Sequence, residues 1–111
     1  MVEVAILATL TLFFMAAIAE IGGGYLIWQW LRNHKRLLFG IFGGVILFAY
    51  GIIPTLQPAS FGRVYAAYGG IFIISSIVWG IIVDKKKPDK YEVIGSVIAL
   101  GGAAVIFYAP R

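Results

Sequence analysis

Four long apolar stretches, separated by short polar or charged segments, dominate this sequence of 111 residues. Each stretch reaches the roughly 20 residues that a helix needs to cross the hydrocarbon core of a bilayer. Four such helices without a polar face could not be solvated together in a water-soluble bundle. The sequence therefore predicts an all-α integral membrane protein with four transmembrane helices in a single domain, residues 1–111. The expected helices span about residues 4–31, 37–56, 62–83 and 91–108.

The composition agrees with this class of protein. Hydrophobic residues make up 61% of the chain and charged residues only 13%, against roughly 25% charged in typical soluble chains. The segment Ala17-Ile18-Ala19 resembles a signal-peptidase site, but no basic region precedes the first apolar stretch, which continues to Leu31. We therefore expect that stretch to be retained as the first helix.

The connecting segments predict an orientation in the membrane. Segments 32–36 and 84–90 lie on the same side and hold seven of the nine Lys and Arg residues. Because positive charge marks the cytoplasmic side, both termini are expected outside, in a multi-pass protein of the plasma membrane. The net charge of +4 lies mostly in these two loops, so it does not point to a nucleic-acid partner.

Residues that usually carry enzyme chemistry are scarce. The chain has no cysteine, and its one histidine, His34, lies in a predicted loop. No phosphate-binding glycine loop and no nucleophile–base pair is present in the sequence. We therefore expect no metal, no cofactor and no catalytic site, and do not expect an enzyme.

Glu20 is the one acid expected at membrane depth. An ionised group there costs roughly 2.5–3.5 kcal/mol on insertion scales. The low dielectric favours the neutral carboxyl, and a carboxyl poised in this way can exchange a proton for a cation. Glu20 could instead be a protonated residue that only hydrogen-bonds a neighbouring helix. We favour the functional interpretation because ionisable residues inside membranes usually mark functional sites.

Small residues surround Glu20 on the same helix face. Ala16, Ala17, Gly23 and Gly24 lie one turn away on either side. Such residues either clear space around the carboxyl group or let two helices approach closely. We expect Ala16, Gly23 and Gly24 to line a cavity beside Glu20.

The third expected helix opens with the string GRVYAAYGG, residues 62–70. Tyr65, Tyr68 and Phe72 recur at helical spacing and form an aromatic face. A tyrosine can offer a hydroxyl group to a carboxylate and a ring face to a cation, although anchoring and packing would explain the same pattern. Arg63, near the outer end, either snorkels to lipid headgroups or stands at the entrance to a site.

The fourth expected helix carries a stripe of small residues at Gly95, Ala99 and Gly102. The two glycines are one heptad apart, a spacing that allows close contact along one helix face. Such a stripe favours helix–helix association between subunits. We therefore expect Gly95, Ala99 and Gly102 to lie in a dimer interface.

Glu20 and the string GRVYAAYGG resemble the YnfA family of four-helix membrane proteins, over nearly the whole chain. That family is related to the small multidrug resistance (SMR) transporters. The wider relation rests on AxxxE, ending at Glu20, on YAxY, beginning at Tyr65, and on the Gly95/Gly102 heptad.

The resemblance implies an SMR-like bundle, a dimer, and proton-coupled antiport that exports small cationic or polarisable compounds. By this resemblance Glu20 binds protons and substrate alternately, and Tyr65 contacts that carboxyl group. Tyr68 stands where many multidrug members have tryptophan, which leaves the substrate class open. Gly95 and Gly102 match the dimer-forming heptad.

Several alternatives stay open. The charge bias allows a parallel homodimer, an antiparallel heterodimer with an oppositely biased paralogue, or a bias overridden during insertion. The function could instead be that of a non-transporting membrane scaffold or subunit, or of an SMR-like lipid-metabolite translocator. The expected partners are membrane lipids, protons, a small-molecule substrate and a second subunit.

Overall fold

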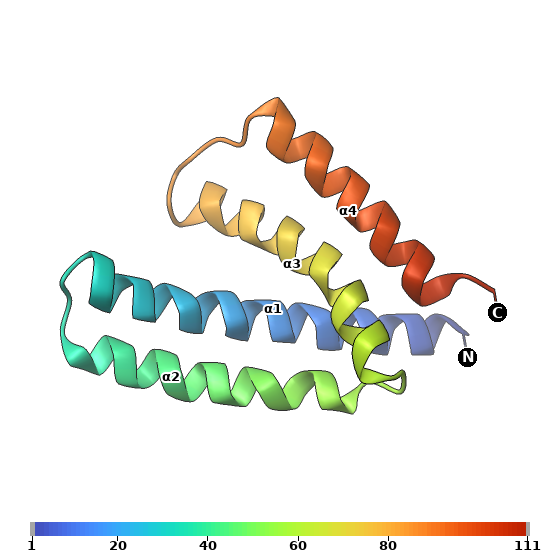
Figure 1. Ribbon diagram of the computed structural model, residues 1–111, viewed down its shortest axis with the longest axis horizontal. Coiled ribbons are helices and arrows are strands. Elements are labelled where there is room, and N and C mark those ends of the chain that lie inside the picture. Colours follow the sequence, from blue (N-terminus) through green and yellow to red (C-terminus); the bar gives the residue numbers. More distant parts are fainter. Residues whose placement is uncertain (1, 111) are drawn as a thin grey trace. The chain divides into compact units, whose positions relative to one another are not determined.

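The computed structural model describes residues 2–110, and the regular structure within this range is entirely helical (Figure 1). The elements are α1 (Val2–Arg32), α2 (Leu37–Ile52), the 3-10 helix η1 (Ile53–Leu56), α3 (Phe61–Ile82) and α4 (Lys90–Tyr108). Four of the described segments are long and apolar enough to cross a membrane, with α2 and η1 counted together. The all-α fold with four membrane-spanning helices is thereby confirmed.

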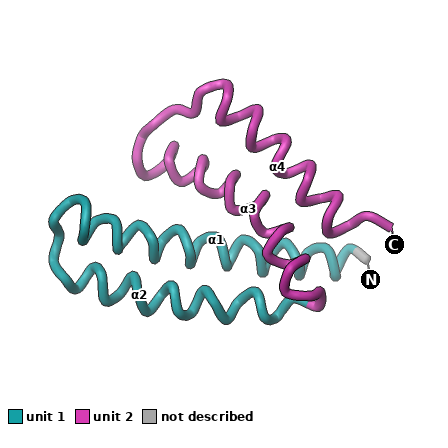
Figure 2. The backbone as a smooth tube through the Cα atoms, in the orientation of Figure 1, with its two compact units in different colours: residues 1–57 teal, residues 58–111 magenta. Residues whose placement is uncertain are grey.

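The chain divides into two compact units, residues 1–57 and residues 58–111 (Figure 2). Each unit is a helical hairpin, α1 with α2 and η1 in the first, and α3 with α4 in the second. That both hairpins form one domain remains a prediction.

The first hairpin has one long and one shorter arm. At 1.5 Å per residue, the 31 residues of α1 extend about 46 Å, well beyond a hydrocarbon core of about 30 Å. The turn that follows is tight because His34 adopts a positive φ of 57°. The amide of Lys35 donates to the carbonyl of Gln29 at 3.1 Å and closes the end of α1.

Pro54 decides how the second arm ends. Proline has no amide hydrogen, and its ring crowds the carbonyl four residues earlier, so an α-helix cannot pass through it undisturbed. The α-helix accordingly stops at Ile52, and the chain continues as the tighter helix η1. The amide of Gln57 then donates to the Pro54 carbonyl at 3.1 Å. The apolar segment predicted at 37–56 is thus an α-helix with a 3-10 extension.

The second hairpin begins its returning helix with a capping box. The amide of Glu92 donates to Asp89 Oδ1 at 2.8 Å, and the amide of Asp89 donates to Glu92 Oε1 at 3.4 Å. This reciprocal pair satisfies amides that the first turn of α4 leaves without helical partners. Pro88, just before the cap, keeps the preceding loop from joining the helix.

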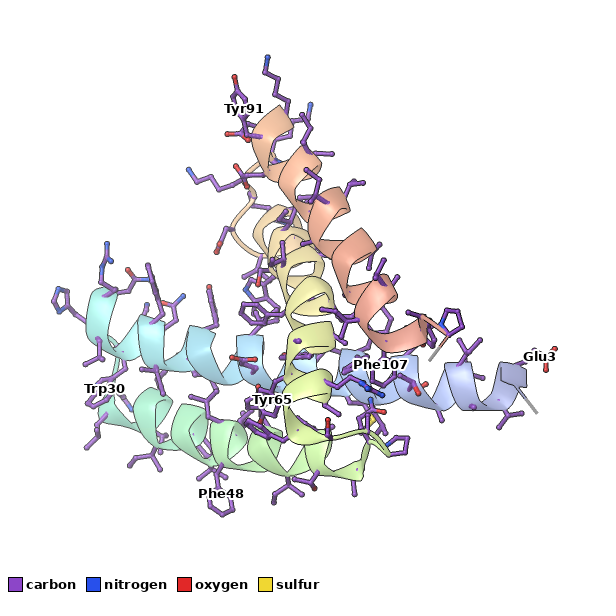
Figure 3. The ribbon with its side chains drawn as sticks, turned by 45° about the vertical axis from the view of Figure 1, so that its right-hand side comes forward. Glu3, Trp30, Phe48, Tyr65, Tyr91 and Phe107 are labelled. Carbon is purple, nitrogen blue, oxygen red and sulfur yellow. The ribbon has the colours of Figure 1, made fainter. Side chains whose placement is uncertain are left out.

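The outer faces of the helices are strongly apolar. Phe48 of α2 is 78% exposed and points away from its own hairpin (Figure 3). Ile18 of α1 and Ile98 of α4 are 68% and 69% exposed. Exposed aliphatic and aromatic side chains on this scale suit contact with lipid chains rather than with water.

Candidate functional site

Glu20 lies well inside α1, twelve residues before the helix ends at Arg32, or about 18 Å along the axis. Its side chain is half-buried. One turn earlier, Ala16 and Ala17 are each only 1% exposed, and one turn later Gly23 is buried. The carboxyl group is therefore positioned on a face of α1 that is built from small, mostly buried residues.

The glycines beside Glu20 serve different purposes. A Cβ atom at Gly23 would stand 2.9 Å from Cγ of Leu47 and 3.0 Å from the carbonyl oxygen of Gly43, so Gly23 is needed where α1 packs on α2. A Cβ atom at Gly24 would meet no atom within 4 Å. Of the two glycines predicted to line a cavity, Gly23 thus takes part in packing, and Gly24 is the one with open space beside it.

The three aromatic residues predicted to share a face of α3 take part in two tilted ring pairs, one of which also includes Phe61. The rings of Phe61 and Tyr65 have centroids 4.4 Å apart, and those of Tyr68 and Phe72 are 6.0 Å apart. Tyr65 is 36% exposed, whereas Tyr68 is only 4% exposed. Tyr65 is therefore the more accessible of the two predicted tyrosines, and Tyr68 is held within the protein.

Glu20 belongs to the first hairpin, and the two tyrosines belong to the second. That Tyr65 and Tyr68 meet the Glu20 carboxyl group therefore stays a prediction. Arg63 lies near the beginning of α3 and is exposed, which fits both the snorkelling and the entrance interpretation.

The three residues of the predicted dimer stripe in α4 differ in what surrounds them. Gly95 and Gly102 are exposed, and a Cβ atom at either would meet no atom within 4 Å. Ala99, between them, is used inside the hairpin, because its carbonyl oxygen lies 2.7 Å from the place of a Cβ atom at Gly70. Two of the three residues are thus open on the surface of this unit.

A polar contact at the other end of α1 was not anticipated from the sequence. The side-chain amide of Gln57 donates to the carbonyl oxygen of Thr9 at 3.0 Å, and both residues are buried, at 7% and 8% exposure. The Oε1 atom of Gln57 is buried and has no hydrogen-bond partner among the described residues. The signal available in the sequence was a glutamine directly after an apolar stretch that ends with a proline.

Residues 2–110 contain no cluster of metal-ligating side chains. Within that range no three His, Cys, Asp or Glu residues come close enough to hold a metal ion. Within the first hairpin the candidate site consists of the Glu20 carboxyl group and its small neighbours, and the tyrosines of the second hairpin remain predicted members of it.

Residues 6–111 match the family described as "Uncharacterised BCR, YnfA/UPF0060 family". The chain belongs to this family. A UPF0060 membrane protein of Clostridium beijerinckii is 60% identical over 108 residues, which cover 96% of this chain and 97% of that protein. The UPF0060 membrane protein YfjF of Bacillus subtilis is 57% identical over 106 residues, with 95% and 97% covered. No solved structure matches the chain significantly.

Membership confirms the family resemblance drawn from Glu20 and GRVYAAYGG. The relatives are named membrane proteins, which agrees with the four apolar helices of this YnfA/UPF0060 chain.

Proposed function

We propose that this YnfA/UPF0060 protein is an SMR-like, proton-coupled antiporter of the plasma membrane that exports small cationic or polarisable compounds. The observation that carries the proposal is Glu20. It is the one acid in the interior of the four candidate membrane spans, since Glu3 and Glu92 lie within a turn of the ends of theirs. A charge at that depth is costly, so an ionisable residue there is by default a candidate functional residue.

Proton and substrate would compete for the Glu20 carboxyl group. The neutral form suits an apolar surrounding, whereas the ionised form is stabilised by a bound cation. Exchange follows if the site faces the two sides of the membrane in turn and if each ligand binds the two states differently. Tyr65 and Tyr68 would complete the site with hydroxyl groups and ring faces for a cation.

A dimer would bring two Glu20 residues into one cavity. The exposure of Gly102 supports this part of the proposal, because a small residue on an open helix face allows a second helix to approach.

The test compares Glu20→Gln with Glu3→Gln. Both changes remove one carboxylate from α1, but Glu3 is exposed in the first turn of the helix. Purified protein in weakly buffered detergent solution is mixed with tetraphenylphosphonium or ethidium, and released protons are measured with a pH indicator. We expect proton release from the unaltered protein and from Glu3→Gln, and none from Glu20→Gln.

Thermal unfolding of both variants checks that they fold equally well. Proton release or export that persists in Glu20→Gln would overturn the proposal. Glu20→Gln and Gly102→Leu are also expressed in cells that lack the protein. If Glu20→Gln restores the phenotype of those cells while Gly102→Leu does not, the scaffold alternative is favoured.

A further inference from the structure

An open groove of about 450 Å³ runs between the second half of α3 and the beginning of α4. Its walls include Phe72, Ile73 and Ile77 of α3 and Tyr91, Gly95 and Ser96 of α4. The volume lies within the range of about 300–1,000 Å³ that is typical of ligand pockets. Phe72, predicted to line a cavity, and Gly95, predicted to lie in a dimer interface, thus come together in one groove.

The groove presents a largely apolar surface, because the polar side chains that line it on α4 already form hydrogen bonds with the backbone. The hydroxyl group of Ser96 donates to the carbonyl of Val93 at 2.9 Å. The carboxylate of Glu92 accepts from the amide of Asp89 in the capping box. The occupant of such a groove is therefore apolar over the part that enters it.

Lysines gather at the end of the groove where α4 begins. Tyr91 marks this end (Figure 3), and the ammonium group of Lys90 lies 5.2 Å from the centroid of its ring. Lys85, Lys86 and Lys87 are exposed in the preceding loop. Three acids lie nearby: Asp89 and Glu92 accept hydrogen bonds from each other's backbone amides in the capping box, and Asp84 lies outside it.

We propose that this groove binds an anionic phospholipid of the surrounding bilayer, with an acyl chain along the apolar walls and the phosphate among the lysines. Residues 84–92 hold four lysines and three acids, and one net positive charge near an anionic membrane surface contributes about 1 kcal/mol, or about fivefold in affinity. A second copy of the chain fits this end less well. Its one cluster of acids, at 84–92, lies among the same lysines and cannot offer a separate negative surface.

Trp79 provides a local probe of the groove. The chain has three tryptophans, and Trp28 and Trp30 both lie in α1. Trp79 is one helical turn after Ser76, which lines the groove. A Trp28→Phe/Trp30→Phe protein therefore reports, through bromine quenching of Trp79 fluorescence, on lipid bound to the second hairpin.

The protein is reconstituted in phosphatidylcholine vesicles that contain increasing amounts of brominated phosphatidylglycerol or brominated phosphatidylcholine. We expect the anionic lipid to quench Trp79 with a severalfold higher apparent affinity. Lys86→Gln/Lys87→Gln/Lys90→Gln should bring this ratio close to one. The matched control Arg32→Gln/Lys35→Gln/Arg36→Gln removes three positive charges from the other basic loop and should keep the ratio.

A second pair of variants tests the groove itself. A Cβ atom at Gly95 or at Gly101 of α4 would meet no atom within 4 Å, so a side chain at either position begins in open space. Gly95→Leu fills the groove and should abolish the lipid preference, whereas Gly101→Leu, outside the groove, should retain it.

Equal quenching by the two lipids in the protein with Trp79 alone would overturn the proposal. An unchanged lipid preference in Gly95→Leu would also overturn the proposal. If that variant in addition changed from dimer to monomer, a second copy of the chain would be shown to cover the groove. None of these measurements depends on proton exchange at Glu20.

Discussion

The carbonyl oxygen of Gly23 lies 2.6 Å from the point where a Cβ atom at Gly43 would stand. Real Cβ atoms do not come this close to an oxygen, so α1 and α2 can pack at this distance only because Gly43 has no side chain. Ile27 and Leu26 of α1 crowd the same point, at 2.9 and 3.1 Å. Gly23 and Gly43 together therefore set the closest approach of the first hairpin.

Gly43→Ala should separate the two helices and destabilise the protein. The added methyl group would meet backbone, which cannot move aside as the end of a flexible side chain can, and overpacking of this kind costs about 1–3 kcal/mol. The matched control is Gly44→Ala, where a Cβ atom would meet nothing within 4 Å. Thermal unfolding in detergent should show a lower midpoint for Gly43→Ala only, and equal midpoints would contradict the prediction.

The second hairpin has a corresponding contact at Gly70 of α3. A Cβ atom there would stand 2.6 Å from Cβ of Ala103 and 2.7 Å from the carbonyl oxygen of Ala99. Gly70→Ala should therefore destabilise the hairpin by about 1–3 kcal/mol. Gly69→Ala, which would meet nothing within 4 Å, should leave stability unchanged or raise it by up to about 1 kcal/mol through helix propensity.

A simple comparison of SDS-induced unfolding checks this prediction. The two alanine variants differ by one position in the same helix, so any general effect of losing a glycine is shared. If Gly69→Ala unfolded at a lower SDS concentration than Gly70→Ala, the close contact between Gly70 and α4 would be contradicted.

The burial of Gln57 predicts different effects on stability for two substitutions at this position. Gln57→Leu loses the hydrogen bond to Thr9, worth about 0.5–1.5 kcal/mol, but also removes the unpartnered buried Oε1 atom, which costs about 1–3 kcal/mol. It should be close to neutral. Gln57→Glu, when ionised, would place a buried carboxylate against the Thr9 carbonyl and should be strongly destabilising.

The stability of Gln57→Glu should depend on pH in a predictable direction. Acidification protonates the introduced carboxylate, so the stability of Gln57→Glu should rise relative to the unaltered protein as the pH falls. Unfolding midpoints measured between pH 8 and pH 5 check this trend, and a stability difference that is constant over this range would argue against burial of the Gln57 side chain.

The two basic loops predict one fixed orientation. Reporter enzymes that are active on only one side of the membrane, fused after residue 111, should report an external C-terminus in a bacterial host. Replacing Arg32, Lys35 and Arg36 by glutamine reduces the bias and should produce a mixed population. Equal activity of both reporters on the unaltered chain would contradict a fixed orientation.

The sequence predicted the helices well because the relevant signal is local. A run of about 20 apolar residues must satisfy its own backbone hydrogen bonds in lipid, which only a helix can do within one segment. The same run also isolates Glu20 as the one acid at depth. The break of α2 at Ile52 has a local cause as well, in Pro54, but its 3-10 geometry is known only from the structure.

The small residues show where local reasoning stops. Gly40 and Gly44 form a small-xxx-small pair in the sequence, yet Gly44 faces open space, Gly40 packs against the Trp30 ring, and the contact with Gly23 is made by Gly43. The hydrogen bond from Gln57 to Thr9 joins residues 48 positions apart and has no local signature.

Composition and the spacing of apolar stretches thus determined the class of protein, the four helices and the position of the lone carboxyl group. The tertiary structure decided which glycines are packing contacts, which remain open, and where a groove forms beside the lysines. The physical reason is that hydropathy acts on each segment separately, whereas a close contact depends on the register and rotation of two helices against each other.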